Sequence, residues 1–156
     1  MAVPKKIINF LEKSKIKYEI IEHKTVYTAH DKAQTLRVPE KMVGKTLVLK
    51  MNGKLAIALI PANKNLDIKK IKNLAKAKKI ELVSERLMKN KFKGVKIGAI
   101  PPFGILWRAP TFIDRSLTKE KEIILNSGDY NFSLKIKQRE IKELDFIIGD
   151  FSTKKK

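Results

Sequence analysis

The sequence predicts a single α+β domain built around a mixed, largely antiparallel sheet. Three observations carry this prediction: the length of 156 residues, a strong hairpin signal near the middle, and the predominance of strand-like runs in the middle and end of the chain. Chains of this length usually form one domain, and a hydrophobic content of 43% suffices for a core. We expect the domain to cover residues 1–150 and a basic tail to follow at 151–156, with a frayed end at 154–156.

The chain before the hairpin is expected to hold two helices and one strand. Three aliphatic side chains recur at helical spacing within residues 4–14. The segment 18–22 has the composition of a strand. Thr28 can cap a helix over residues 29–36, with Asp31 at its third position as an acidic variant of the capping box. The strand is thus expected between two helices.

The clearest local signal is the hairpin itself. Two apolar runs, residues 45–51 and 54–60, flank Asn52-Gly53, which is the preferred pair for a two-residue type I′ turn. Pro61 ends the second run. Both runs are apolar enough to be central strands.

The second half is expected to alternate short strands with short helices. A helix with a lysine-rich outer face is predicted over residues 66–75, and Ser84 can cap a second helix. The remaining predicted strands are 80–83, 105–107, 111–113, 122–125, 130–136 and 146–148, with a short helix at 138–144.

Positive charge dominates the composition and is unevenly placed. The net charge is +19, and residues 64–96 carry twelve lysines and arginines against three acids. Such a band attracts a polyanion, first of all nucleic acid and secondly an anionic membrane surface. Lysines outnumber arginines, which favours attraction to phosphate over bidentate reading of bases. A lysine-rich composition that serves solubility alone is the alternative.

The chain lacks the residues that several classes of catalytic site require. The chain has no cysteine and two histidines, His23 and His30, so a thiolate nucleophile, a disulfide framework and a His-rich metal site are not expected. No Gly-x-Ser-x-Gly nucleophile motif occurs. Gly44-Lys45-Thr46 resembles the end of a P-loop, but position 39 is Pro and a strand follows. We expect no metal and no cofactor.

The N-terminus lacks the long apolar segment of a signal peptide, and no apolar run approaches the length of a membrane span. We therefore expect a soluble, cytoplasmic protein that does not enter the membrane.

The stretch Gly98-Ala-Ile-Pro-Pro-Phe-Gly104 is expected to form a stiff loop between two apolar runs. Glycine permits close backbone approach, and a Pro-Pro pair fixes two φ angles and removes two amide donors. We expect the amides of Gly98, Ala99 and Ile100 to face a substrate. A tight connection between two strands is the alternative.

Lys45 stands where a loop becomes a buried strand. A lysine at such a place needs water or an anion for its ammonium group. Lys45 is therefore either a surface lysine that extends to solvent or a point charge at a pocket mouth, suited to a phosphate or a polarised carbonyl.

Four short motifs, taken in their order along the chain, resemble those of the YbaK/prolyl-tRNA synthetase-associated domain family of aminoacyl-tRNA deacylases. The resemblance covers about residues 5–145. It rests on Thr-Ala-His-Asp-Lys-Ala at 28–33, Lys45-Thr-Leu-Val, the Gly-x-x-x-Pro pattern from Gly98 to Pro102, and Asn-Ser-Gly at 126–128.

The resemblance implies a barrel-like sheet flanked by helices and a trans-editing activity. The enzyme would hydrolyse the ester of a mischarged aminoacyl-tRNA, and Ala- or Cys-tRNA(Pro) is the expected substrate. The tRNA would come from an aminoacyl-tRNA synthetase that has released it, and such a synthetase is the other expected partner. The implied catalytic residues are Lys45, Gly98, Ala99 and Ile100. The implied substrate-binding residues are Tyr27, Thr28, Pro101, Pro102, Ser127 and Gly128.

One departure from the family concerns specificity. Some members carry a histidine after the late turn, where this chain has Asp129 and Tyr130, so alanine specificity does not carry over from them. A non-catalytic tRNA- or RNA-binding module with the same fold is the alternative function. A membrane-surface protein is less well supported, because the basic helix lacks Trp or Phe on its apolar face.

Overall fold

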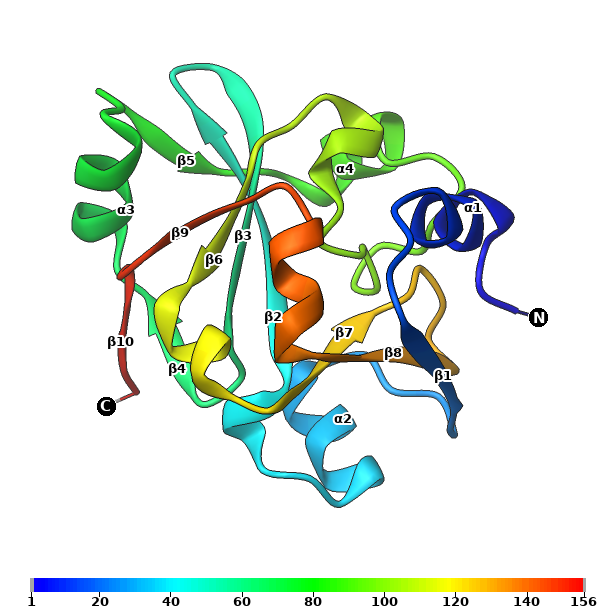
Figure 1. Ribbon diagram of the computed structural model, residues 1–156. Coiled ribbons are helices and arrows are strands. Elements are labelled where there is room, and N and C mark those ends of the chain that lie inside the picture. The colour runs from blue at the N-terminus through cyan, green and yellow to red at the C-terminus, as the bar shows by residue number, and fades with distance from the viewer. Residues whose placement is uncertain (1, 156) are drawn as a thin grey trace.

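Two main sheets, one two-stranded sheet and four α-helices carry the fold in the computed structural model, which describes residues 2–155 (Figure 1). The helices are α1 Lys5–Lys13, α2 Ala29–Leu36, α3 Ile68–Ala75 and α4 Glu85–Lys91. The strands are β1 Tyr18–Glu22, β2 Gly44–Met51, β3 Lys54–Pro61, β4 Lys64–Leu66, β5 Ile80–Leu82, β6 Thr111–Asp114, β7 Glu122–Asn126, β8 Phe132–Lys137, β9 Phe146–Gly149 and β10 Ser152–Lys154. Short 3₁₀ segments are η1 Glu40–Met42, η2 Gly104–Trp107, η3 Arg115–Lys119 and η4 Gln138–Glu143.

The larger sheet is mixed. Its strand order is β5-β2-β3-β6-β9, in which β2 runs antiparallel to β3 and β5 while β3, β6 and β9 are parallel. The smaller sheet, β1-β8-β7, is antiparallel throughout. The predicted α+β domain with a mixed central sheet is therefore confirmed.

The barrel-like closure implied by the resemblance is not present in residues 2–155. A single bridge between Val43 and Ile124 joins the two sheets. The outer edges of the larger sheet are β5 and β9, and neither pairs with the smaller sheet, so the strands stay open.

The local predictions that rest on turn and cap chemistry are confirmed. Asn52 and Gly53 have φ of 51° and 81°, both positive as a type I′ turn requires. Thr28 Oγ1 accepts a hydrogen bond from the Asp31 amide at 3.0 Å, and Ser84 Oγ accepts one from the Leu87 amide at 3.3 Å. Helix α2 therefore begins where the cap predicted it.

The strand predicted at 105–107 is instead the 3₁₀ segment η2. The amide of Gly104 donates to Thr111 Oγ1 at 2.9 Å, and a Cβ on Gly104 would collide with the carbonyl of Ala109. This close approach turns the chain before β6, so the segment cannot extend. The helix predicted at 138–144 is also a 3₁₀ segment, η4.

The C-terminal segment continues the fold through Lys154, which corrects the frayed end predicted for that residue; Lys155 lies in no helix or strand, and Lys156 lies outside the described residues. Strand β10 pairs with β4, and Phe151 is fully buried. Asp114, at the end of β6, accepts hydrogen bonds from the Phe151 amide and from Ser152 Oγ, both at 2.9 Å. A contact distant in sequence therefore anchors the tail.

The main core lies between α1 and the inner faces of both sheets, and it includes Ile7, Leu11, Leu59, Ile113 and Leu125. Helix α2 packs through Ala33 against Val43 and Ile124, where β2 and β7 approach each other (Figure 1). Among the described residues, no helix is both long and apolar enough to cross a membrane.

Candidate active site

Two segments that are far apart in sequence, 96–100 and 126–129, are joined by hydrogen bonds. The Lys96 amide donates to the Gly128 carbonyl at 2.9 Å, and the Gly128 amide donates to the Ala99 carbonyl at 2.8 Å. Asn126 Nδ2 donates to the Ile100 carbonyl at 3.2 Å. The stiff loop predicted at Gly98 is thus tied to the turn after β7.

Gly98 has φ +72°, a conformation that other residues rarely adopt. A Cβ at this position would lie 3.4 Å from Tyr130 Cε1 and 3.7 Å from the Tyr27 carbonyl oxygen. The Tyr27 and Tyr130 rings pack edge to face with centroids 4.8 Å apart. The backbone conformation, rather than lack of space, therefore favours glycine at this position.

Two cavities meet at this loop. The larger, of about 340 Å³, lies between β2, α4 and the loop, and its walls are mostly apolar. The smaller, of about 10 Å³, lies between the N-terminus of α2, the loop and the turn after β7. Gly98 and Asn126 line both cavities. The larger cavity is also lined by Thr46, Leu47, Val48, Leu82, Val83, Glu85, Met88, Ile97 and Ile100.

The three amides predicted to face a substrate are not equivalent. The Ala99 amide donates back into the loop, to the Lys96 carbonyl at 3.0 Å, which removes it from the predicted set. Within the described chain, the amides of Gly98 and Ile100 have no hydrogen-bond partner. Pro101 and Pro102 have no amide donor. Two donors of the loop are therefore available to a ligand.

Lys45 lines neither of these two cavities. Thr46 faces the larger cavity and accepts from Asn126 Nδ2 at 3.4 Å, whereas Lys45 Nζ donates to the Lys64 carbonyl at 3.1 Å. Partial burial, and then the nearby Lys155, lower the pKa of Lys45 below its usual value. Whether Lys45 takes part in a reaction remains a prediction.

Sequence reasoning missed Lys32, the lysine of α2, which lines the smaller cavity together with Gly98 of the loop. Its side chain is 5% exposed, and Nζ donates to Asn126 Oδ1 at 2.6 Å. Burial lowers its pKa to about 8. A signal was present: Ala29, Lys32, Ala33 and Leu36 follow the i, i+3, i+4, i+7 spacing of an inward helix face. The general tendency of lysine to be exposed obscured it.

The sequence match and the geometry now agree. Residues 23–144 match the family described as the aminoacyl-tRNA editing domain. The chain belongs to this family. The resemblance to YbaK-like editing domains is thereby confirmed.

Solved structures share the fold of this editing domain. A hypothetical protein, APE2540, is 22% identical with a TM-score of 0.86, over 96% of this chain and 100% of its own. A candidate trans-editing enzyme for prolyl tRNA synthetase is 19% identical with a TM-score of 0.82, over 98% of this chain and 99% of its own. Identities this low establish the fold alone.

The other predicted site residues of the editing domain fall into two groups. Tyr27 and Thr28 line the smaller cavity with Gly98 and Ala99. The remaining residues are buried and line neither of these two cavities: Pro101, Pro102, Ser127 and Gly128.

Ser127 has a supporting role. It is fully buried, and its hydroxyl donates to the Phe132 carbonyl at 2.7 Å, so it holds the turn instead of facing a ligand. A Cβ on Gly128 would lie 2.9 Å from Val95 Cγ1, so that glycine packs beneath the loop.

The two histidines are engaged elsewhere. His23 Nε2 bonds Ser133 Oγ at 2.8 Å, and His30 pairs with Glu40. No group of three His, Cys, Asp or Glu side chains suited to a metal ion occurs in residues 2–155.

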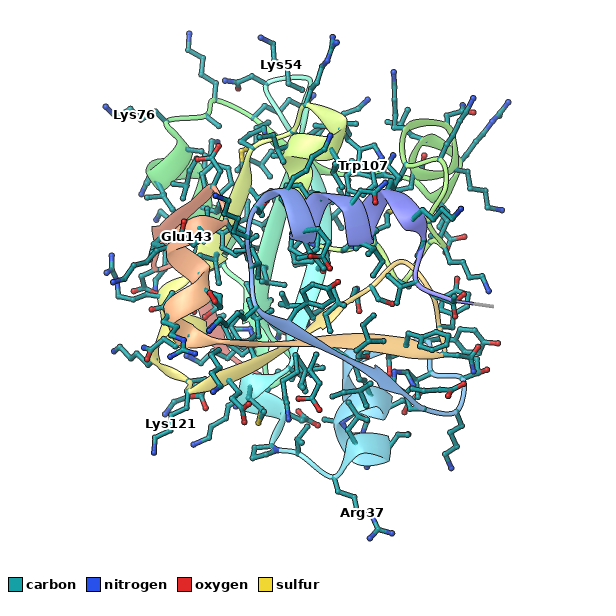
Figure 2. The ribbon with its side chains drawn as sticks, turned by 45° about the vertical axis from the view of Figure 1, so that its right-hand side comes forward. Arg37, Lys54, Lys76, Trp107, Lys121 and Glu143 are labelled. Carbon is teal, nitrogen blue, oxygen red and sulfur yellow. The ribbon has the colours of Figure 1, made fainter. Side chains whose placement is uncertain are left out.

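The basic band flanks the larger cavity of the editing domain. Residues 64–96 form β4, α3, β5 and α4, and the last two supply cavity walls. Basic side chains extend beyond this band. In Figure 2, Lys54 projects from the same end of the molecule as Lys76 of the band, and Arg37 and Lys121 project from the other end.

Proposed function

We propose that this editing domain hydrolyses the ester that joins an amino acid to the 3′ end of a tRNA, acting in trans. Membership of the aminoacyl-tRNA editing family supports the substrate class. The observation that carries the reaction is the Gly98 loop, which offers two unengaged amides at the edge of a cavity of about 340 Å³. Unengaged backbone amides in a shielded site can stabilise the negative oxygen that forms when an ester carbonyl is attacked.

The reaction needs little from protein side chains. An aminoacyl ester is already activated, and the vicinal ribose hydroxyl can assist the attacking water, so no protein nucleophile is required. Positioning the ester against the loop then supplies much of the rate enhancement. This agrees with a site that contains no cysteine and whose histidines are engaged elsewhere.

The walls of the larger cavity favour an uncharged acyl group. Leu47, Val48, Val83 and Ile97 contribute apolar surface, and Glu85 adds a carboxylate suited to an α-ammonium group. Alanine or cysteine esterified to tRNA(Pro) is the proposed substrate. A charged side chain would be desolvated in this cavity without a partner.

The tRNA is held mainly through its phosphates. The basic band beside the cavity attracts a polyanion, and phosphate contacts position a nucleic acid without reading its sequence. Lys45, with Lys155 nearby, is assigned to this binding role and not to the ester. A synthetase that releases mischarged tRNA is the proposed source of substrate.

The test is deacylation of tRNA(Pro) carrying alanine, cysteine or proline by the purified protein. We expect alanine or cysteine to be released faster than proline and faster than the spontaneous rate, and Gly98→Val to remove the catalysed part. Salt-dependent tRNA binding without release of any amino acid would instead establish the alternative, a non-catalytic RNA-binding module.

A further inference from the structure

Lys32 occupies a place in α2 where an apolar residue would be expected. It shares the inner face of the helix with Ala33, and its side chain is 5% exposed. Burying an ammonium group is unfavourable unless it is paired and hydrogen-bonded. A lysine in this position therefore calls for a partner.

The structure gives the Lys32 ammonium group only one hydrogen-bond acceptor in the described chain. An ammonium group has three N–H donors, and one is used by Asn126 Oδ1 at 2.6 Å. In the described chain, no carboxylate pairs with Lys32. The acid of the same cavity, Asp129, pairs with Lys96 at 3.4 Å and accepts from the Asn131 amide at 2.9 Å. Two donors of Lys32 are left for a ligand.

The space beside these donors suits a single oxygen atom. The cavity that Lys32 shares with Gly98 and Ala99 has a volume of about 10 Å³, about one water molecule. A buried, unneutralised cation next to a loop with unengaged amides attracts an oxygen that carries negative charge.

Asn126 fixes the ammonium group in place. Its Oδ1 accepts from Lys32, and its Nδ2 donates to the Ile100 carbonyl at 3.2 Å and to Thr46 Oγ1 at 3.4 Å. Only the carbonyl oxygen of the amide can accept from an ammonium, so the orientation of the Asn126 side chain is defined. Helix α2, strand β2 and the loop are joined through this one residue.

We propose that Lys32 is a catalytic residue that stabilises the negative ester oxygen in the transition state, together with the amides of the Gly98 loop. This inference rests on the proposed function. Water attacks the ester carbonyl carbon, a new C–O bond forms, and the π electrons move to the carbonyl oxygen, which faces Lys32. When that oxygen re-forms the double bond, the ribose oxygen leaves and receives the proton lost by the water. Lys32 transfers no proton.

The test compares Lys32→Met with Lys41→Met, an exposed lysine nearby in η1. We expect Lys32→Met to lower the catalysed kcat on the aminoacyl-tRNA by about 10²–10³-fold, with tRNA affinity changed less than about twofold because phosphate contacts dominate it. Lys41→Met should match the wild type. The thermal midpoint of Lys32→Met should not fall, since a buried unpaired charge has been replaced by an apolar side chain of similar length.

Chemical rescue separates catalysis from folding. The chain has no cysteine, so Lys32→Cys provides a unique thiol that 2-bromoethylamine converts into a lysine analogue. Restored hydrolysis supports a requirement for the ammonium group. Full activity of Lys32→Met beside an active wild type would overturn this inference and leave the proposed function intact. Loss of activity together with a lowered thermal midpoint and no rescue would overturn it in favour of a structural role. Absence of hydrolysis by the wild type would remove the proposed function and this inference together.

Discussion

At the scale of single residues, the site depends on how two lysines are oriented. Lys32 points into the cavity beside the Gly98 loop, whereas Lys45 is bonded to the Lys64 carbonyl. Both lysines have lowered pKa values because of burial, that of Lys32 to about 8. Each has one protein acceptor, and they differ in access to water: Lys32 is 5% exposed, whereas Lys45 is only partly buried.

The lowered pKa of Lys32 predicts a pH dependence of activity. Catalysed hydrolysis should decline above about pH 8 as the ammonium loses its proton. The other titratable side chains that line the same cavity are Tyr27, Asp129 and Tyr130. Rates of amino-acid release, corrected for spontaneous base hydrolysis at each pH, provide the measurement. A corrected rate that keeps rising to pH 10 contradicts the prediction.

The same shift predicts a pH dependence of stability. The unfolded chain keeps the Lys32 proton up to about pH 10.5, while the folded chain keeps it only up to about pH 8. The unfolded state therefore binds more protons between these values, and stability rises with pH across that window. The free energy of unfolding should rise by on the order of 3 kcal/mol more in the wild type than in Lys32→Met. Urea unfolding at pH 7.5 and pH 10 measures this; equal changes in both proteins would contradict it.

Gly98 offers a second test at this scale. A Cβ on a residue with φ +72° adds backbone strain on the order of 1–2 kcal/mol. Gly53, at the hairpin tip, has φ +81° with nothing near its missing Cβ, so Gly53→Val carries comparable strain far from the site. We expect both valine variants to lose similar stability and only Gly98→Val to lose hydrolysis. If both valine variants lost hydrolysis, the loss in Gly98→Val would be explained by reduced stability alone.

At the scale of elements, long-range hydrogen bonds hold the C-terminal strand in place. Asp114 is buried, and desolvation alone would raise its pKa. Hydrogen bonds from Ser116, the Phe151 amide and Ser152 outweigh this effect, so the pKa of Asp114 lies below its usual value. The carboxylate therefore links β6 to β10, which pairs with β4.

Removing that carboxylate should release the C-terminal strand. Asp114→Ala leaves the Phe151 amide without its acceptor, and we expect a loss of about 2–4 kcal/mol in unfolding free energy. Ser152→Ala, which removes one donor, should cost less. Because the pKa of Asp114 is lowered on folding, its stabilisation is present at neutral pH and declines as the carboxylate is protonated in acid. Hydrogen exchange at Ser152–Lys154 reports the release; unchanged protection in Asp114→Ala contradicts this account.

Short-range chemistry made some elements predictable and left others hidden. The hairpin and the capped start of α2 depend on neighbouring residues, Asn52-Gly53 and Thr28, so the sequence states them directly. Strand β10 depends on Asp114, which lies 38 residues from Ser152 in sequence. The hydrogen bond of Lys45 could not be predicted because its acceptor, the Lys64 carbonyl, lies 19 residues away in sequence.

At the scale of the whole molecule, charge should govern tRNA binding. The net charge of +19 predicts that affinity falls steeply as salt rises. Replacing three exposed lysines of the basic band by glutamine, Lys69, Lys76 and Lys78, should weaken tRNA binding and flatten the salt dependence. Three exposed lysines outside the band serve as the control, Lys121, Lys137 and Lys142. Equal effects of the two triple variants would show that net charge, not the band, sets the affinity.

The most direct test of the account is a single-turnover deacylation experiment with excess protein and tRNA(Pro) charged with alanine or cysteine. We predict that the wild type releases the amino acid well above the spontaneous rate. Gly98→Val and Lys32→Met should bind the same tRNA but release the amino acid at close to the spontaneous rate. Release by the wild type that does not exceed the spontaneous rate for either ester, at protein concentrations that saturate tRNA binding, would contradict the proposed activity.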